Sequence, residues 1–531
     1  IQGDAMINSD GNGDSTFDMV WYSKGKIDDQ GYTVECRVPL QSIRFPGKET
    51  ITIRISFFRQ IIRTSEMFSF PPMYADEGSL LKQSQQISVS GWKYQRVFEL
   101  LPALTHSTRQ SVDQGKMQTD QEDTDVSLTG KVGLTSDLTL DAAYNPDFSQ
   151  VEADAGQIDV NLRYSLFYSE KRPFFLEGND IFQFAGNVEE GPLALVVHTR
   201  TIIDPILGFK LTGKLGRRSS LAAIYARDDL PDDPIDTHPD FTIARYKYAL
   251  KEDSYIGGFY TAREYGEGFN RVIGTDGRFR LTQTSIADFH LFGAFSQRNG
   301  ETETAGDHAL GLHYQYATRK VILDLGYQDI SKNFQIDTGF ITRTGIRRMS
   351  AFGMYRFYPK SDFFQRIEPF YWSFHLYDTE DELFESFNLF ALRFWLPRST
   401  MFRVDTLLAN EVFGGDRFNT SGVGMQTSSQ ITKQVFMNLF FRRTGLVYYD
   451  PEDPFQGYGN RLGGGIQYQP TDKLSFVLSL SFIDFYRDSD KTKLYDYAIL
   501  RSRSTFQINK YLFLRAIVEY NDFRDRLTID L

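Results

Sequence analysis

The segment DAAYNPDFSQVEADAGQIDVNLRYSLFYSEKRPFFLEGNDIF, residues Asp141 to Phe182, interrupts an otherwise regular series of strand-like patterns. It combines acidic and basic side chains with many aromatic ones. This is too much charge for a buried core and too many aromatic residues for a flexible linker. We therefore expect an ordered segment that lies on or inside the structure built by the strands around it.

Those strands alternate apolar and other residues over stretches of about ten positions, the length of a membrane-spanning strand. The pattern runs from Tyr94 to the end of the chain. Three apolar rows illustrate it: Leu512, Leu514, Ala516, Val518 and Tyr520; Val435, Met437, Leu439 and Phe441; Val321, Leu323, Leu325 and Tyr327. The positions between them accept charge, as at Asp324 and Glu519. One face against lipid and one against a wet lumen would produce this difference.

Short and long connections alternate between these strands. Thr282–Ser285, Thr318–Lys320 and Pro397–Thr400 are short, whereas Asp228–Phe241, Ser331–Arg347 and Tyr448–Asn460 are long. In outer-membrane barrels the short turns are periplasmic and the long loops lie outside. The strand-like segments number about 23, and since bacterial barrels prefer even numbers we expect about 24–26 strands in an intact protein. Both ends of this chain look cut.

The predicted fold class is therefore all-β: a large antiparallel transmembrane β-barrel, residues 93–531, preceded by part of a β-sandwich module, residues 1–92. No apolar run approaches the roughly 18 residues that a membrane-spanning helix needs. The net charge of −11, without any Lys/Arg block, excludes nucleic acid as a partner. The single cysteine, Cys36, excludes an intrachain disulfide, and we expect it to be a small buried hydrophobic residue.

The N-terminal part contains two alternating strand patterns, Tyr32–Val38 and Ile51–Phe57, and a loop of oxygen-bearing residues and glycines. Asp10, Asn12 and Asp14 have a spacing that suits a hard cation such as Ca²⁺, although an Asx/Gly turn is the commoner use of this composition.

Three runs in this part, Asp18–Trp21, Gly31–Leu40 and Ile43–Phe45, resemble the C-terminal half of family 9 carbohydrate-binding modules. Such modules bind sugars between aromatic rings and often carry Ca²⁺, which would make Trp21 and Trp92 the carbohydrate-binding residues.

Two further runs, Asn145–Asp154 and Tyr168–Gly178, resemble the signature of a largely uncharacterised family of Gram-negative outer-membrane proteins. That family couples an N-terminal carbohydrate-binding-like module to a C-terminal β-barrel, and its members are sometimes labelled membrane-associated hydrolases. The regular alternation of short and long connections fails only here. We therefore expect residues 145–192 to form a plug or constriction in the lumen.

The charged residues of this segment support two hypotheses. Glu152, Asp154, Glu170 and Glu177 are weak candidates for the acid and base of a glycosidase, if the fold holds two of them at the right separation. The favoured alternative is a plug held by ion pairs among Asp147, Glu152, Asp154, Lys171, Arg172 and Glu177. Catalysis therefore stays uncertain, with a non-enzymatic protein preferred.

The leading functional hypothesis is an outer-membrane barrel that binds glycans or related solutes, or lets them pass, above a periplasmic carbohydrate-binding-like module. The expected partners are outer-membrane lipid, a glycan and other envelope proteins, and Ca²⁺ is the one cofactor considered. One alternative is a structural or assembly subunit whose long loops, such as Ser331–Arg347, dock partner proteins. A second alternative is a carbohydrate-active hydrolase.

Overall fold

The structure is a computed structural model. It describes the chain except for residues 1–5, 8–12, 15–19, 114–115, 149–153, 188–190, 230–237, 301–304 and 510–511, and the single positions 44, 46, 63, 75, 95, 147, 252, 299 and 531.

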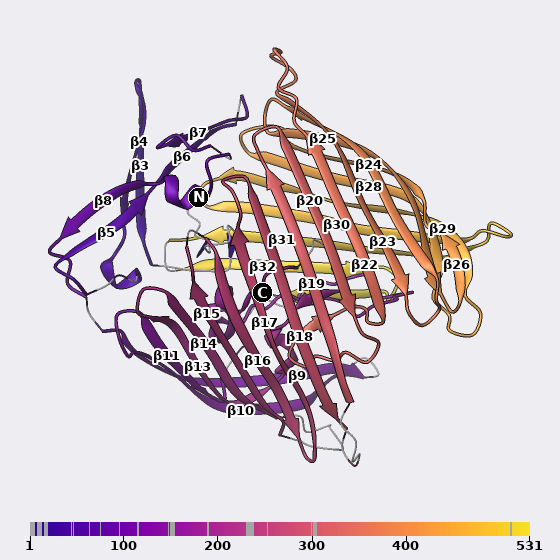
Figure 1. The fold of residues 1–531 in the computed structure, drawn as a ribbon, viewed down its shortest axis with the longest axis horizontal. Helices are drawn as coiled ribbons and strands as arrows, with labels where there is room; N and C mark the ends of the chain where they lie inside the picture. Colours follow the sequence, from indigo (N-terminus) through magenta and orange to yellow (C-terminus); the bar gives the residue numbers. More distant parts are fainter. Residues whose placement is uncertain are drawn as a thin grey trace.

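Twenty-three strands of the described chain form one closed antiparallel barrel (Figure 1). Most of them pair with the next strand along the chain, as the hairpin pattern of the sequence predicts. The barrel strands are β9 (Phe98–Asp113), β10 (Lys116–Gly133), β11 (Leu138–Tyr144), β13 (Pro205–Leu215), β14 (Ser219–Asp228), β15 (Asp240–Ala249), β16 (Tyr255–Tyr265), β17 (Gly268–Arg280), β18 (Ser285–Gln297), β19 (Ala305–Ala317), β20 (Val321–Ile330), β22 (Ile346–Tyr355), β23 (Arg366–Asp378), β24 (Phe384–Leu396), β25 (Thr400–Phe413), β26 (Asp416–Asn419), β27 (Gly422–Gln430), β28 (Val435–Tyr448), β29 (Phe455–Thr471), β30 (Leu474–Arg487), β31 (Lys493–Gln507), β32 (Phe513–Asn521) and β33 (Arg526–Asp530).

The predicted fold class is confirmed: the chain is nearly all-β and is dominated by one large antiparallel barrel. The short strands β26 and β27 both pair with β25, one beyond the other, and β33 lies next to β9 where the barrel closes. The count of 23 strands agrees with the number of segments read from the sequence. The larger number of 24–26 stays a prediction about an intact protein.

The two faces of the barrel follow the alternation in the sequence. Leu325, Leu439 and Leu514 are 43%, 41% and 61% exposed on the outer face. On the neighbouring lumen-facing positions, Gln328 is 0% and Ile517 is 4% exposed. Because side chains alternate across a strand, these apolar rows point outward and the positions between them point into the lumen.

The described residues before the barrel form short paired strands beside its short-turn end (Figure 1). β1 (Met6–Ile7) pairs with β2 (Gly13–Asp14), β3 (Tyr22–Asp28) with β4 (Gly31–Arg37), β5 (Thr50–Ile55) with β8 (Gln85–Ser90), and β6 (Phe57–Ile61) with β7 (Glu66–Phe70). The single turns η1 (Leu40–Ser42) and η2 (Leu80–Gln83) connect them. Cys36 is exposed on β4, so the expectation that it is buried was wrong. No second layer of described residues covers this hairpin.

The N-terminal region touches turns on two sides of the barrel. At one side the Tyr94 hydroxyl donates to the Thr135 carbonyl, at 2.8 Å, in the connection between β10 and β11. At the other, the Ser65 hydroxyl donates to the Leu396 carbonyl at 3.0 Å and accepts a bond from the Ser399 N–H at 2.7 Å. The region therefore reaches from the β10–β11 turn to the β24–β25 turn.

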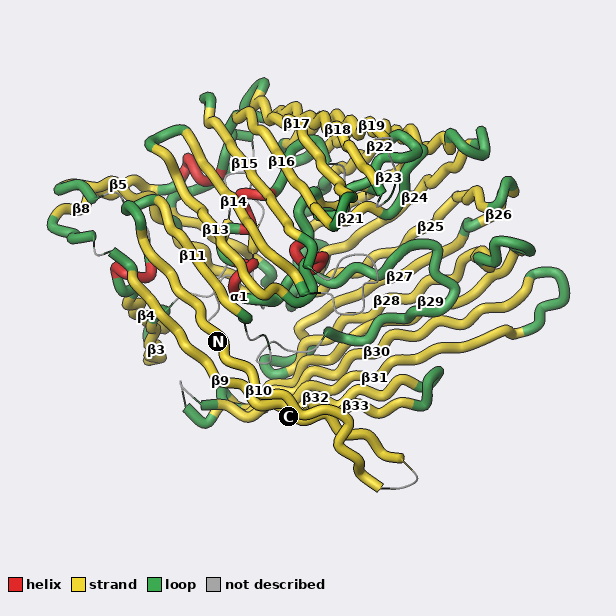
Figure 2. Tube along the Cα trace, turned by 90° about the horizontal axis from the view of Figure 1, so that it is seen from below, coloured by secondary structure: helices red, strands yellow, loops and turns green. Residues whose placement is uncertain are grey.

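The chain leaves the barrel wall after β11 and returns as β13, which pairs directly with β11. Of the intervening residues, 154–187 and 191–204 fold inside the barrel and are named the lumen segment here (Figure 2). The segment contains α1 (Pro173–Leu176), η3 (Asn179–Phe182), η4 (Thr199–Thr201) and β12 (Leu193–Leu195), and β12 pairs with β21 (Phe340–Ile341) of the long β20–β22 loop. Among the described residues, no helix is long and apolar enough to cross a membrane.

The lumen segment shares the largest hydrophobic cluster with the barrel wall. Phe175, Phe182 and Ile202 of the segment pack with wall residues such as Ile243 and Phe292. Phe334 and Ile336 of the β20–β22 loop are buried in the same cluster. Part of this long loop therefore folds inward onto the lumen segment.

Candidate functional site

The lumen segment is held together by a buried ion pair between Glu170 and Arg172. The Arg172 Nη2–Glu170 Oε2 distance is 2.8 Å, and both side chains are 5% exposed. The Glu170 carboxylate also accepts bonds from the Thr199 hydroxyl at 2.6 Å and from the backbone N–H of Arg172 at 2.8 Å. Arg172 donates in turn to the Thr199 and Ile202 carbonyls, at 2.6 and 2.7 Å. These bonds join two parts of the segment that lie about 30 residues apart in sequence.

The guanidinium of Arg172 lies over aromatic rings as well. Its Cζ atom is 4.4 Å from the ring centre of Phe175 and 5.1 Å from that of Phe148. A desolvated guanidinium gains cation–π energy from such rings. The sequence Glu170-Lys171-Arg172-Pro173-Phe174-Phe175 therefore folds into a compact clamp of charge and aromatic carbon.

The other charged residues singled out from the sequence have separate partners. The Lys171 Nζ is 3.1 Å from an Asp154 carboxylate oxygen, and Arg200 pairs with the same carboxylate. Glu177 pairs with Lys131 of β10. The structure thus brings Asp154, Lys171 and Arg200 together, and Glu170 with Arg172, while Glu177 is bound to the barrel wall. Asp147 and Glu152 lie outside the described residues.

A tight turn at Ala185 and Gly186 fixes the segment to the opposite wall. The Ala185 N–H donates to Asp276 at 2.8 Å, and the Ala185 carbonyl lies 3.0 Å from the His290 Nδ1. Asp276 is paired with Arg245 at 2.6 Å, and both side chains are fully buried. Gly186 has a φ of +74°, which glycine adopts without strain.

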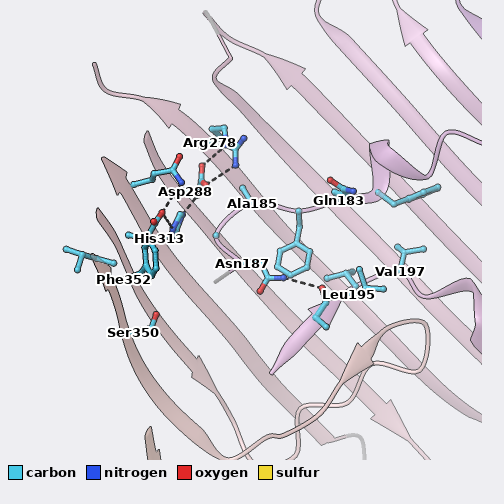
Figure 3. Close-up of a pocket in the computed structure, with 18 of the residues that line it drawn as sticks. Gln183, Ala185, Asn187, Leu195, Val197, Arg278, Asp288, His313, Ser350 and Phe352 are labelled. Carbon is cyan, nitrogen blue, oxygen red and sulfur yellow. Dashed lines mark hydrogen bonds and ion pairs between the residues drawn. The ribbon is translucent and has the colours of Figure 1, made fainter. Parts of the chain in front are cut away.

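A cavity of about 490 Å³ lies between this turn and the barrel wall (Figure 3). The lumen segment contributes Gln183, Phe184, Asn187 and the stretch 194–197 to one side of it. Strands β17 to β23 form the other side. The lining residues whose side chains face the lumen are Arg278, Asp288, His313, Gln315, Asp324, Ser350, Phe352 and Trp372. This volume falls within the range of about 300–1,000 Å³ found for small-molecule sites.

The polar half of the cavity is one connected network. Arg278 binds Asp288 through two bonds, of 2.9 and 3.1 Å. His313 lies between two carboxylates, with its Nδ1 3.5 Å from Asp288 and its Nε2 3.4 Å from Asp324. Gln315 donates to Asp324 at 2.8 Å. Figure 3 shows Arg278, Asp288 and His313 side by side on the wall, facing the turn at Ala185.

The aromatic half continues along the same row of cross-strand neighbours. Asp324 lies opposite Phe352, and Phe352 lies opposite Trp372. A solute in the cavity would therefore meet aromatic rings at one end and carboxylate, amide and imidazole groups at the other. Hydroxyl groups can both donate to and accept from such a lining.

Sequence reasoning named none of these cavity residues as part of a binding site. The available signals were that charge is accepted at Asp324 and that His313 lies within a strand pattern, where hydrogen bonding in the lumen or at an interface is expected. The register of several strand pairs decides which polar positions of β17 to β23 become neighbours. That register could not be predicted from the sequence.

The residues proposed for sugar and metal binding have other surroundings. Trp92 packs edge-on against Phe45, with ring centres 5.4 Å apart, and Trp21 is partly exposed. Asp10 and Asn12 lie outside the described residues, as does the side chain of Asp14. Across the described part of the chain, no group of three or more His, Cys, Asp or Glu side chains could hold a metal ion. Sugar binding at Trp21 and Trp92, and Ca²⁺ binding at the aspartate loop, stay predictions.

Residues 98–188 match a family model described as a domain of unknown function, DUF5916. This match covers less than half of the chain, and it includes both runs, Asn145–Asp154 and Tyr168–Gly178, that carry the resemblance to uncharacterised outer-membrane proteins. No curated protein matches the chain.

Among solved structures, the chain is similar to a mutant of the ferric enterobactin receptor PfeA from Pseudomonas aeruginosa, with 9% sequence identity and a TM-score of 0.36. The alignment covers 82% of this chain and 76% of the receptor.

The stability of the lumen segment at acidic pH should depend on the buried Glu170–Arg172 ion pair. Burial raises the pKa of Glu170, but the bonds and charge of Arg172 and the bond from Thr199 outweigh it, so the pKa lies below its ordinary 4.5. A carboxyl with a lowered pKa stabilises the fold above its unfolded pKa, and this contribution is lost as the pH falls through the folded pKa. We therefore expect the lumen segment to become more susceptible to pepsin as the pH falls below the ordinary pKa of a glutamate.

The Glu170→Gln variant is the control, because it lacks the titrating group. Its cleavage by pepsin should change less across the same acidic range. Equal pH profiles for the two proteins would contradict the role given to Glu170.

Proposed function

We propose that this chain is an outer-membrane β-barrel of a Gram-negative bacterium, with its N-terminal region on the periplasmic side. The outward rows of exposed leucine, phenylalanine and tyrosine support a lipid contact, because soluble monomers rarely expose so large an apolar surface. The contacts of Ser65 and Tyr94 with short turns support the periplasmic position, since short turns lie on that side of such barrels.

The solute handled by the barrel is proposed to be a glycan or a related polyhydroxylated molecule. The observation that carries this proposal is the cavity of about 490 Å³, in which Trp372 and Phe352 adjoin Asp324, Gln315 and His313. Sugars present apolar C–H faces to aromatic rings and hydroxyl groups to amides and carboxylates. A cavity with a few convergent polar groups on an apolar lining is the usual form of a binding site.

The lumen segment is proposed to act as the plug of this barrel, so that passage requires it to move. Its bonds to the wall support a closed resting state: Arg163 pairs with Glu385 and Glu411, at 3.3 and 2.5 Å, and Asp276 holds Ala185. The enclosure of Glu170 by bonds from its own segment supports a structural role for that carboxylate in place of a catalytic one.

Binding of oligosaccharides to the purified full chain tests the proposal. In a panel of oligosaccharides assayed by calorimetry, at least one should bind, and Trp372→Leu should weaken it about tenfold, which corresponds to 1.4 kcal/mol. Gln315→Leu should weaken the binding as well, because a sugar hydroxyl group loses the amide as its hydrogen-bond partner. Liposome swelling with the same sugars measures passage.

Tyr371→Leu is the matched control for Trp372→Leu. Tyr371 is the adjacent aromatic residue on β23, and its ring packs on Phe390 at 4.8 Å, on the outer face. Its replacement should leave oligosaccharide binding unchanged. The proposal fails if no oligosaccharide of the panel binds, or if the Trp372 and Tyr371 variants bind alike.

A further inference from the structure

We propose that the barrel carries a second binding site, for an oxyanion such as a phosphate or sulfate group of a soluble molecule. The site is a group of arginines on the lumen wall of β22 to β28, named the arginine cluster here. Its members are Arg356, Arg366, Arg393, Arg403 and Arg442. Its residues differ from those that line the cavity described above, although both sites use β23, so it does not depend on glycan binding.

Three of the arginines surround a single buried carboxylate. Nitrogens of Arg366, Arg393 and Arg356 lie 2.7, 3.1 and 3.3 Å from oxygens of Glu368, whose side chain is 1% exposed. The Trp395 Nε1–H donates to the same carboxylate at 2.8 Å. One negative charge thus faces three positive ones, and its oxygens already have several neighbours.

The remaining two arginines repeat this arrangement beside the first group. Arg403 and Arg442 lie 3.1 and 2.5 Å from oxygens of Asp405, whose side chain is fully buried. Arg393 and Arg403 are direct cross-strand partners on β24 and β25. The two groups therefore form one continuous patch.

The charges of this patch do not balance. Five arginines against Glu368 and Asp405 leave an excess of three positive charges. The arginine side chains are 18% to 31% exposed, whereas the two carboxylates beneath them are hidden. Guanidinium groups remain charged at any physiological pH. Holding like charges together in a half-buried place is unfavourable unless an anion compensates them.

The hydrogen bonding between these arginines and the two carboxylates is incomplete. The Nε atoms of Arg356, Arg366, Arg393 and Arg403 are the nitrogens that approach Glu368 and Asp405, but neither they nor the buried Nε of Arg442 makes a hydrogen bond in good geometry. Aromatic rings hold two of the guanidinium planes: Arg366 lies 4.7 Å from the Trp395 ring and Arg393 lies 5.0 Å from the Phe370 ring. Arginines fixed in this way bind phosphate-like groups through their paired N–H donors.

The position of the cluster indicates when a solute would meet it. Arg366 is the first residue of β23, and Arg393 and Arg403 flank the short β24–β25 turn. The cluster therefore lies toward the short-turn end of the lumen, near the mouth touched by Ser65. An anionic solute would be bound at that end.

Calorimetric titration of the purified full chain with inorganic pyrophosphate tests this site. Pyrophosphate should bind, and added sodium chloride should weaken the binding by screening. Arg366→Gln and Arg403→Gln should each weaken it at least tenfold, because each removes a charge and the paired donors. Arg271→Gln should leave it unchanged, since Arg271 pairs with Glu264 at a site where both are well exposed.

A variant that is expected to bind pyrophosphate more tightly distinguishes a lost site from a misfolded protein. Asp405→Asn removes a negative charge at nearly constant size and should tighten pyrophosphate binding severalfold. The proposal is overturned if the unmodified chain does not bind pyrophosphate, if the Arg366 and Arg403 variants bind like Arg271→Gln, or if Asp405→Asn weakens the binding.

Discussion

Replacing Arg172 by methionine is expected to release the lumen segment from its closed arrangement. The substitution leaves the Glu170 carboxylate buried without its cation, and breaking a buried pair in this way costs about 3–5 kcal/mol. The Thr199 and Ile202 carbonyls lose their donor as well. Limited proteolysis should then cut within residues 154–204, and the conductance of single barrels in planar bilayers should rise, while the barrel itself stays folded.

Two comparisons separate this effect from a general loss of stability. Arg200→Met removes a partner of Asp154 at a more exposed place, 29% for the arginine, where an ion pair contributes less than about 1 kcal/mol. It should leave protease resistance nearly intact. Combining Glu170→Leu with Arg172→Met removes both charges and should restore part of the resistance. A single Arg172→Met variant that is as resistant as the unmodified chain would refute the clamp.

Gly186→Val is expected to detach the turn of the lumen segment that lies against β18. A Cβ atom at Gly186 would lie 2.8 Å from the carbonyl carbon of Phe289, and main-chain atoms cannot move aside without disturbing the strand. The φ of +74° adds strain of about 1–2 kcal/mol for a residue with a side chain. The bonds from Ala185 to Asp276 and His290 should break, and hydrogen exchange of the Ala185 amide should become fast.

Gly216→Val is the matched control for this turn. Gly216 has a φ of +76°, close to that of Gly186, but nothing lies within 4 Å of its Cβ position. The backbone strain is therefore the same, and the collision is absent. Conductance should increase for Gly186→Val only; an equal increase in both variants would assign the effect to strain and not to the contact with β18.

The barrel could be predicted because its evidence is local. The alternation of Val435, Met437, Leu439 and Phe441 with other residues is a property of one strand, and a period of two assigns a whole strand to two faces. Turn composition at Thr282–Ser285 and Pro397–Thr400 is local too. These signals gave the all-β class, the hairpin order and the outward rows. The expectation that Cys36 is buried was wrong, because residue type alone does not say whether a second layer covers a hairpin.

The segment Asp141–Phe182 shows where local reasoning ends. Its composition predicted an ordered and charged element, and its signature runs lie within the residues matched by the family model. The ion-pair partner of each charged side chain could not be predicted from the sequence. Arg163 reaches Glu385 and Glu411, and Ala185 reaches Asp276, all of them many residues away. Such pairs exist only after the barrel has closed and has set the positions of its strands around the lumen.

The sequence by itself determined a closed antiparallel barrel with an apolar outer face, because strand periodicity and turn chemistry act between near neighbours. Only the tertiary structure decided what lies inside. The cavity row from Arg278 to Trp372 and the arginine cluster from Arg356 to Arg442 are each assembled across several strands. Their geometry depends on the register of successive strand pairs, and a shift of one residue at any pair would turn those side chains toward the outer face.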